Sequence, residues 1–291
     1  MFQGAMVAIV TPFKDGEVDE ASLRQLIEFQ IANGTDGIVP CGTTGESATL
    51  TFKEHERVIE ITVEQVNKRV PVIAGTGSNN TEEAISLTRH ARKAGADGAL
   101  MIAPYYNKPT QEGLFRHFET VAQKVDIPII LYNIPGRTAV NMEPATIARL
   151  ARVDNIVGVK EASGSMKQIT DIVALCDERF VMLSGEDYLT YPLICVGGKG
   201  VISVVSNVAP RDMADLCRLT LGGSLTEARN LYYRLLPICH ALFCETNPAP
   251  VKAALAMMKK IASDEVRLPL VPLAETNRER LRADLQAYGL L

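Results

Sequence analysis

Hydrophobic residues along this chain gather in short runs separated by longer amphipathic stretches. Apolar runs of about four to eight residues that end at turn-forming residues predict buried β-strands. Here such runs recur at intervals of roughly 25 to 35 residues. They begin at Met6, Gly37, Pro71, Gly98, Pro128, Ile156, Phe180 and Gly200. The pattern therefore predicts eight strands.

The stretches between these runs predict helices. Leu23, Leu26, Ile27 and Ile31 fall at helical spacing in residues 20–34. Strands that alternate with helices predict a parallel sheet, and nearly continuous apolar strands predict burial on both faces. Eight such units fit a closed α/β barrel, the (β/α)8 or TIM barrel. An open doubly wound sheet is the alternative, but the first strand-to-helix turn lacks the glycine pattern of a dinucleotide-binding fold.

The strand pattern stops after about residue 222, and three helical stretches follow, at 225–243, 247–260 and 274–289. We therefore predict a catalytic barrel domain over residues 1–222 and a C-terminal helical region over residues 223–291. No low-complexity linker separates the two. We expect the helical region to pack on the barrel or against another subunit.

Composition and charge narrow the possible partners. Hydrophobic residues make up 47% of the chain and charged residues 22%, as in ordinary globular proteins. A net charge of −4 without a basic cluster argues against nucleic acid or an anionic membrane as the main partner. No apolar run approaches the roughly 20 residues of a membrane helix. Six scattered cysteines without a C-x-x-C pair are typical of reduced thiols in a cytosolic protein. We predict a soluble cytoplasmic protein whose partners are small molecules and other chains.

The chemistry of such a barrel lies at the carboxyl ends of its strands. The sixth run ends in Lys160, which is followed by Glu161. A lysine amine attacks carbonyl groups once burial has lowered its pKa from about 10.4. Adjacent residues of a strand point to opposite faces, so Glu161 is no obvious counter-ion. Position alone leaves two interpretations, a Schiff-base lysine and a buried lysine paired with another carboxylate.

Other strand ends carry polar groups that suit the same chemistry. Tyr132 ends an otherwise aliphatic strand, where its phenol can shuttle protons or simply pack in the core. Thr43 and Thr44 stand between glycines and can donate hydroxyl and amide groups to a carboxylate, although a turn alone would need only the glycines. Arg137 offers a planar fork for a second carboxylate, and the alternative is an arginine in solvent.

Two further features are expected to have no catalytic role. The glycine-rich segment 195–200 precedes the eighth strand, so we predict a turn on the face away from the chemistry. The histidines, His55, His90, His117 and His240, all fall in predicted helices. A metal-dependent aldolase needs several ligands that converge at the strand ends. We therefore expect no metal site.

Six segments together resemble the dihydrodipicolinate synthase family, the 4-hydroxy-tetrahydrodipicolinate synthases of lysine and diaminopimelate biosynthesis. They are GTTGES (42–47), PYYNKPTQEG (104–113), LYNIPGRT (131–138), GVKEASG (158–164), NPAPVK (247–252) and RLPLVPL (267–273). The resemblance runs from Gly4 to the C-terminus. GTTGE and the strand lysine are shared with other pyruvate-dependent class I aldolases, whereas YNIPGRT and NPAPVK point to the synthases.

The resemblance implies a lyase that condenses pyruvate with L-aspartate-4-semialdehyde. The nearest alternative is a related aldolase or lyase that acts on a sugar acid such as N-acetylneuraminate. Arg137 favours the synthase, because a sugar chain needs hydroxyl partners more than a guanidinium. A non-catalytic sensing or scaffold barrel is a weaker alternative, since both Lys160 and Tyr132 are present.

The family also implies catalytic roles. Lys160 would form the Schiff base with pyruvate, without any cofactor. Tyr132 would donate and accept protons, linked through Thr43 to Tyr106 of a neighbouring subunit. Members are typically homotetramers built as a dimer of dimers.

Substrate-binding roles follow in the same way. Thr44 and the backbone around Ile202 would hold the pyruvate carboxylate. Arg137 would receive the carboxylate of the semialdehyde, and Gly185 would line the pocket. The segment GED at 185–187 replaces the common GDD and keeps its charge.

Many family members bind L-lysine as a feedback inhibitor at the dimer interface. The matching positions are Ala48, His55, Asn79, Glu83 and Tyr105. Phe52 stands where some lysine-sensitive members have a histidine, and its ring could still cover the stem of the ligand. The resemblance therefore implies L-lysine as an effector.

Overall fold

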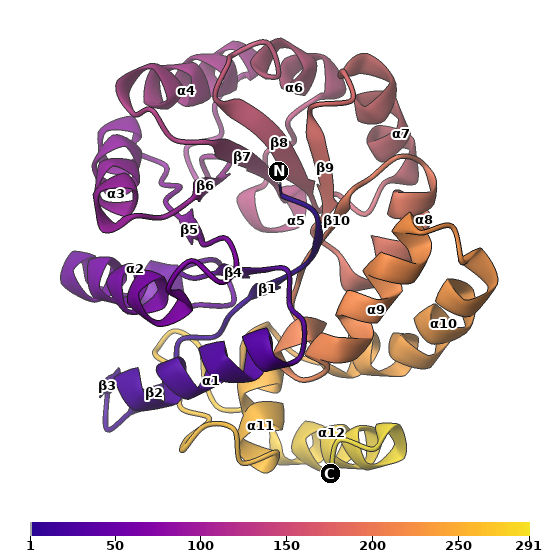
Figure 1. The fold of residues 1–291 in the computed structure, drawn as a ribbon. Helices are drawn as coiled ribbons and strands as arrows, with labels where there is room; N and C mark the ends of the chain where they lie inside the picture. Colours follow the sequence, from indigo (N-terminus) through magenta and orange to yellow (C-terminus); the bar gives the residue numbers. More distant parts are fainter. Residues whose placement is uncertain (1) are drawn as a thin grey trace.

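The computed structural model describes residues 2–291, and its centre is one parallel sheet (Figure 1). Within the described residues, eight strands form this sheet in the order β4-β1-β10-β9-β8-β7-β6-β5. They are β1 (Gly4–Ala8), β4 (Gly37–Val39), β5 (Ile73–Gly75), β6 (Gly98–Ile102), β7 (Ile129–Asn133), β8 (Ile156–Glu161), β9 (Val181–Ser184) and β10 (Gly200–Ser203). A parallel bridge between Ile38 and Val72 joins β4 to the strand segment that leads into β5 and closes the barrel. Each strand overlaps one predicted run, so the (β/α)8 barrel is confirmed.

Helices surround the strands in a ring (Figure 1). The longer ones are α1 (Glu20–Ala32), α2 (Phe52–Val66), α3 (Thr81–Ala94), α4 (Gln111–Lys124), α6 (Pro144–Leu150), α7 (Met166–Leu175), α8 (Thr190–Cys195) and α9 (Pro210–Leu221). Short helical turns are α5 (Pro135–Thr138), η1 (Ser47–Thr49), η2 (Asp187–Leu189) and η3 (Val205–Asn207). Local sequence sets the ends: Thr51 and Glu54 form a capping box at the start of α2, and Gly95 ends α3 in the left-handed conformation.

Side chains alternate between two apolar layers along each strand. Leu131 belongs to the layer between strands and helices, whereas Ile130 and Tyr132 belong to the layer inside the barrel. This alternation follows from the period of two in a strand. The inner layer fills the barrel, so functional groups can reach solvent only at its ends.

A small hairpin precedes α1, which the sequence pattern did not predict. Strands β2 (Phe13–Lys14) and β3 (Glu17–Val18) pair in antiparallel fashion. Asp15 and Gly16 connect them with φ angles of 55° and 83°. Two left-handed residues match the twist of a tight hairpin. Strands of two residues are too short to show a hydrophobic period.

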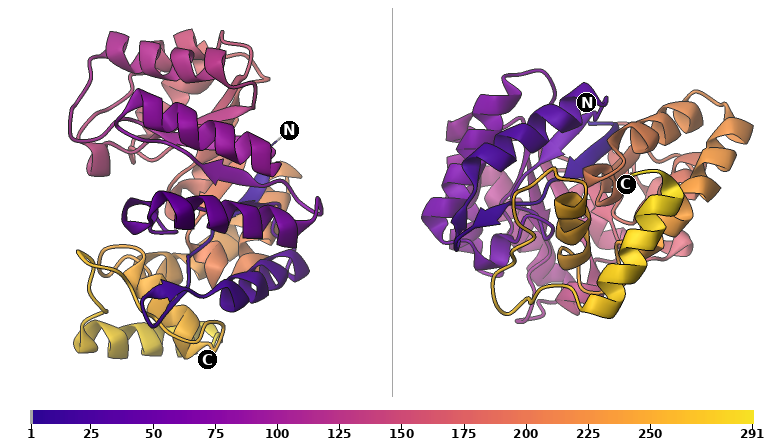
Figure 2. Two further views of the ribbon diagram at one scale, coloured as in Figure 1. Left: turned by 90° about the vertical axis from the view of Figure 1, so that its left-hand side faces the viewer. Right: turned by 90° about the horizontal axis from the view of Figure 1, so that it is seen from below.

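Three C-terminal helices complete the chain, α10 (Leu225–Ala241), α11 (Ala249–Met257) and α12 (Glu275–Tyr288). They lie together on one side of the molecule, as the view from below shows (Figure 2). Every residue of α11 from Ala249 to Leu255 is buried. The proposed boundary at residue 222 falls in the short turn between α9 and α10, and the division into two domains stays a prediction. None of the helices in the described part of the chain is long and apolar enough to cross a membrane.

Candidate active site

Lys160 is the second-last residue of strand β8, and only 6% of its surface is exposed. It is the register partner of Tyr132 on β7, and its Nζ atom lies 4.2 Å from the centroid of the Tyr132 ring. Burial lowers the pKa of Lys160 to about 8, and the nearby Asp187 and Glu186 oppose this shift. A neutral amine is therefore available close to neutral pH.

Glu161 does not neutralise this lysine. Its carboxylate faces the helix layer, where it accepts hydrogen bonds from Asn133 (2.9 Å), Gln168 (3.1 Å) and the backbone of Ser163 (2.7 Å). Among residues 2–291, no carboxylate oxygen lies within 4.0 Å of Nζ of Lys160. The alternative of a buried, paired lysine therefore does not describe Lys160.

Tyr132 is buried at the same end of the barrel. Burial raises the pKa of its phenol to about 12, and contacts with Thr43 and the charge of Arg137 act in the opposite direction. The phenol therefore keeps its proton at neutral pH and can donate it to a reacting group beside the amine.

The loop from Gly42 to Ser47 follows β4 and carries Thr43 and Thr44. The buried Thr44 hydroxyl accepts a hydrogen bond of 3.0 Å from the Asn247 amide, and the Gly45 carbonyl accepts one of 2.7 Å from the Thr11 hydroxyl. These contacts hold the loop in place. We did not single out Asn247 from the sequence, although it opens the NPAPVK segment.

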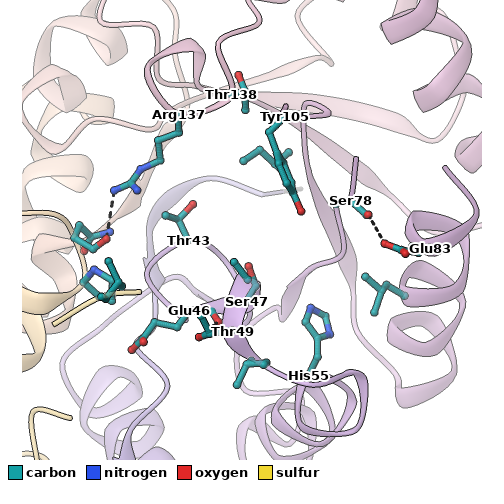
Figure 3. Close-up of a pocket in the computed structure, with 18 of the residues that line it drawn as sticks. Thr43, Glu46, Ser47, Thr49, His55, Ser78, Glu83, Tyr105, Arg137 and Thr138 are labelled. Carbon is teal, nitrogen blue, oxygen red and sulfur yellow. Dashed lines mark hydrogen bonds between the residues drawn. The ribbon is translucent and has the colours of Figure 1, made fainter. Parts of the chain in front are cut away.

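Arg137 lies in the short helix α5, at the mouth of the barrel. Its guanidinium donates to the Asn247 carbonyl over 3.3 Å and borders a cavity of about 460 Å³ (Figure 3). A second cavity of about 30 Å³ reaches Tyr132. Thr43, Ser47 and Ile102 line both, so the outer cavity leads towards the phenol. Lys160 is not among the residues that line either cavity.

Gly185 follows β9 beside the lysine, and Ile202 lies on β10, one strand further from β8. A Cβ atom at Gly185 would lie 3.1 Å from Cε of Lys160 and 2.6 Å from Cβ of Ala162. Any side chain there would push the lysine aside. Ile202 is buried in the inner layer on β10 and pairs with Met6. The structure therefore places Gly185 next to Lys160 and Ile202 in the inner layer of the barrel.

Two acids after Gly185 complete the surroundings of the lysine. Burial, with the charge of Asp187, raises the pKa of Glu186 to about 7. Burial also raises the pKa of Asp187, whose carboxylate accepts hydrogen bonds from the backbone of Val204 (3.1 Å) and Val205 (3.2 Å). The sequence showed these acids only as a variant of a family motif, without a role.

Tyr106 is not brought to Tyr132 within one chain. Its side chain is 89% exposed, and its backbone has a φ angle of 72°, a rare conformation for a residue of this size. The loop therefore presents this ring to solvent.

The predicted effector residues lie together at the outer cavity. Ala48, His55, Glu83 and Tyr105 line it (Figure 3). Asn79 stands beside them, because its amide donates to the Tyr105 carbonyl over 3.2 Å.

Two of these polar groups differ in their contacts. The Glu83 carboxylate accepts a hydrogen bond of 2.8 Å from Ser78. The buried Nδ1 atom of His55 has no partner among residues 2–291. Phe52, the departure from the family pattern, also lines the cavity.

All four histidines lie in helices, His55 in α2, His90 in α3, His117 in α4 and His240 in α10. In the described part of the chain, no group of three or more histidine, cysteine or acidic side chains could hold a metal ion. A mechanism without metal or cofactor stays a prediction.

Comparison with known proteins identifies the family. The model of the dihydrodipicolinate synthetase family matches residues 1–288. The chain belongs to this family. It is 77% identical to the 4-hydroxy-tetrahydrodipicolinate synthase of Syntrophobacter fumaroxidans over all 291 residues, which is 100% of both chains. The predicted family and synthase activity are therefore confirmed, and the sugar-acid alternative is not favoured.

Solved structures agree with this assignment. A chloride-inhibited dihydrodipicolinate synthase from Acinetobacter baumannii, complexed with pyruvate, is 46% identical with a TM-score of 0.98, and the match covers 100% of both chains. A family member from Cyanidioschyzon merolae with lysine bound is 40% identical with a TM-score of 0.97, covering 100% of this chain and 99% of that one.

Proposed function

We propose that this chain joins pyruvate to L-aspartate-4-semialdehyde through a Schiff base on Lys160. The observation that carries this proposal is a buried lysine that has no counter-ion among residues 2–291 and lies 4.2 Å from the ring of a protonated tyrosine on the adjacent strand. The pyruvate complex of the Acinetobacter baumannii relative supports the choice of the first substrate.

The first half of the reaction uses the amine and the phenol together. The neutral amine of Lys160 attacks the keto carbon of pyruvate, and Tyr132 supplies a proton to the oxygen that leaves as water. Thr44 and the amides of its loop hold the pyruvate carboxylate. Loss of a proton from the methyl carbon of the resulting iminium then leaves a nucleophilic enamine. No cofactor is needed for these steps.

The second half joins the two carbon skeletons. The enamine carbon attacks the aldehyde carbon of the semialdehyde, whose carboxylate binds Arg137 through two parallel hydrogen bonds. The aldehyde oxygen takes up a proton and becomes a hydroxyl group, and the iminium on Lys160 forms again. The amino group of the semialdehyde then attacks the carbon bound to Lys160, closes the ring and releases the lysine amine. Arg137 thereby selects an acid over a sugar chain.

We propose a homotetramer, built as a dimer of dimers, as the working form in the cytoplasm. The exposed ring of Tyr106 supports this assembly. A second subunit would place this phenol beside Thr43 and extend the proton path from Tyr132 to solvent. One chain alone leaves that path unfinished.

We further propose L-lysine as an effector bound at the outer cavity. Glu83 suits the ammonium group of an amino acid, and the exposed ring of Phe52 can cover its aliphatic stem. The lysine complex of the Cyanidioschyzon merolae relative supports this proposal. Calorimetric titration with L-lysine tests it, and saturable binding that is lost in Glu83→Gln is the expected result.

The central test is reduction with borohydride in the presence of pyruvate. We expect mass spectrometry to find the reduced pyruvate adduct on the peptide that contains Lys160. Lys160→Met is the matched control and should carry no adduct. An adduct on another lysine, or none on the active wild-type protein, contradicts the mechanism.

A further inference from the structure

The loop that carries Thr43 and Thr44 is turned back by Glu46, a residue outside the proposed chemistry (Figure 3). Glu46 has a φ angle of 53°, in the left-handed region that favours glycine. Its amide donates to the Thr43 carbonyl over 3.1 Å, so the two residues share one tight turn. A rotation of the Glu46 backbone would therefore move Thr43.

The Glu46 carboxylate is held by groups that come from the far end of the chain. Lys252 of α11 donates to Oε1 over 2.7 Å, and both side chains are almost fully buried, with 0% exposed for the lysine and 1% for the glutamate. The backbone amide of Arg267 donates to Oε2 over 3.2 Å. Each oxygen of the carboxylate therefore has a donor from the C-terminal region.

Stability alone does not account for such a pair. Removing two charges from water is costly, and well-packed apolar residues of similar volume are often as stable as a buried ion pair. A directed ion pair can instead fix one backbone geometry, which an apolar contact does less well. The strained turn at Glu46 is a position that needs such support.

A second contact ties the same helix to the same loop. The Asn247 amide, just before α11, donates to the Thr44 hydroxyl over 3.0 Å, and the Asn247 carbonyl accepts from Arg137. The C-terminal region therefore contacts the loop that carries Thr43 and Thr44, and it also contacts Arg137, the residue proposed to bind the second substrate.

We propose that Lys252 is a positioning residue that acts through Glu46 to hold Thr43 and Thr44 in the geometry that binds pyruvate. This makes α11 part of the pyruvate site, although it contributes no atom to the reaction. The inference rests on the proposed function, because it assumes that pyruvate reacts at Lys160.

The experiment compares variants by the pyruvate concentration that half-saturates borohydride trapping on Lys160. The variants are Lys252→Met, Glu46→Gln and the double variant. Asp264→Asn is the control, because it breaks another ion pair of the C-terminal region, with Arg278, that includes no residue of the loop 42–47. Thermal unfolding and the pH profile of trapping are measured in parallel.

We expect Lys252→Met to raise the half-saturating pyruvate concentration about tenfold or more, since small misplacements of binding groups have effects of this order. The pH midpoint of trapping should stay unchanged, because the surroundings of Lys160 are intact. The double variant should recover thermal stability without recovering pyruvate binding. Asp264→Asn should lower stability at most, with wild-type trapping.

The outcomes separate the two proposals. Absence of an adduct in the wild type overturns the proposed function itself. A normal wild-type adduct together with wild-type half-saturation in the folded double variant overturns the positioning role of Lys252. If Lys252→Met does not fold, Glu46→Gln, which keeps the shape and one oxygen acceptor of the side chain, takes its place in the comparison. Wild-type half-saturation in Glu46→Gln would then have the same meaning.

Discussion

Lys160 of β8 and Lys252 of α11 are both buried, and they differ in whether a carboxylate is paired with the amine. Lys160 and Lys252 each place their ammonium group over an aromatic ring, 4.2 Å from Tyr132 and 4.1 Å from Phe13. Lys252 is paired with Glu46 at 2.7 Å, whereas no carboxylate among the described residues comes within 4.0 Å of Lys160. Both lysines are buried, and we infer that the counter-ion separates their roles: the unpaired Lys160 reacts, and the paired Lys252 stabilises the loop.

The two lysines also differ in the acidic residues around them. Around Lys160 the acids Glu186 and Asp187 are themselves buried, and their raised pKa values weaken them as counter-ions. Desolvation can therefore lower the pKa of this amine. Burial also lowers the pKa of Lys252, although the charge of Glu46 and its hydrogen bond with the amine oppose this shift. The pKa is lowered at both sites, and what differs is the carboxylate paired with Lys252.

The largest expected effect is on stability, with opposite signs at the two lysines. Lys252→Met should lower the free energy of unfolding by about 3–5 kcal/mol, because it leaves a buried carboxylate unpaired. Lys160→Met should raise it by about 1–3 kcal/mol at neutral pH, because it removes an unpaired charge from the core. Denaturant unfolding measures both. The same sign at both positions would refute the comparison.

The next effect concerns the space around the reactive lysine. Gly185→Ala places a methyl group 3.1 Å from Cε of Lys160 and 2.6 Å from Ala162, so the amine must move. We expect kcat/KM to fall about 100-fold. Gly136→Ala is the matched control, since a Cβ atom there would meet no atom of the described residues within 4 Å. Equal activity of both variants would show that the position of the lysine is not critical.

The smallest effect is the pH dependence of the reaction. With a pKa of about 8 at Lys160, the fraction of neutral amine, and with it kcat/KM for pyruvate, should rise about tenfold from pH 7 to pH 9. Initial rates across this range measure it. A flat profile would contradict the assigned pKa.

The lowered pKa of Lys160 makes stability depend on pH in the opposite direction from a lysine whose pKa is raised by a salt bridge. Between pH 8 and the ordinary lysine value of 10.5, the unfolded chain binds a proton at Lys160 that the folded chain does not. The contribution of Lys160 to stability should therefore rise with pH across this window. The rise in stability should be smaller in Lys160→Met, and the part that remains includes the contribution of Lys252, whose pKa is lowered as well.

Much of the fold and the core of the site followed from the sequence. Eight apolar runs marked the strands, and successive strands of a parallel barrel pair with each other, so Tyr132 and Lys160 had to meet. The hairpin at Phe13 was missed because its strands have only two residues each. The hydrophobic period of a strand and its pairing with the next strand are local features of the sequence. They are enough to predict contacts between neighbouring βα units.

Contacts across the chain could not be predicted in this way. Lys252 stands in an otherwise apolar helix, and its partner Glu46 lies 206 positions earlier. Nothing in the spacing of either residue points to the other. Asn247 escaped for the same reason, since its contact with Thr44 spans 203 positions. The family motifs drew attention to both segments without explaining why they belong together.

The long separation between Glu46 and Lys252 has a consequence for how the protein is made. A ribosome synthesises the catalytic lysine, the tyrosine and the threonine loop well before it reaches α11. Until then Glu46 lacks Lys252 as its counter-ion, and under the positioning role proposed for this pair the threonine loop would not yet be held in place. The chain would then become able to bind pyruvate only late in translation, once the C-terminal helices have packed against the loop beside the reactive amine.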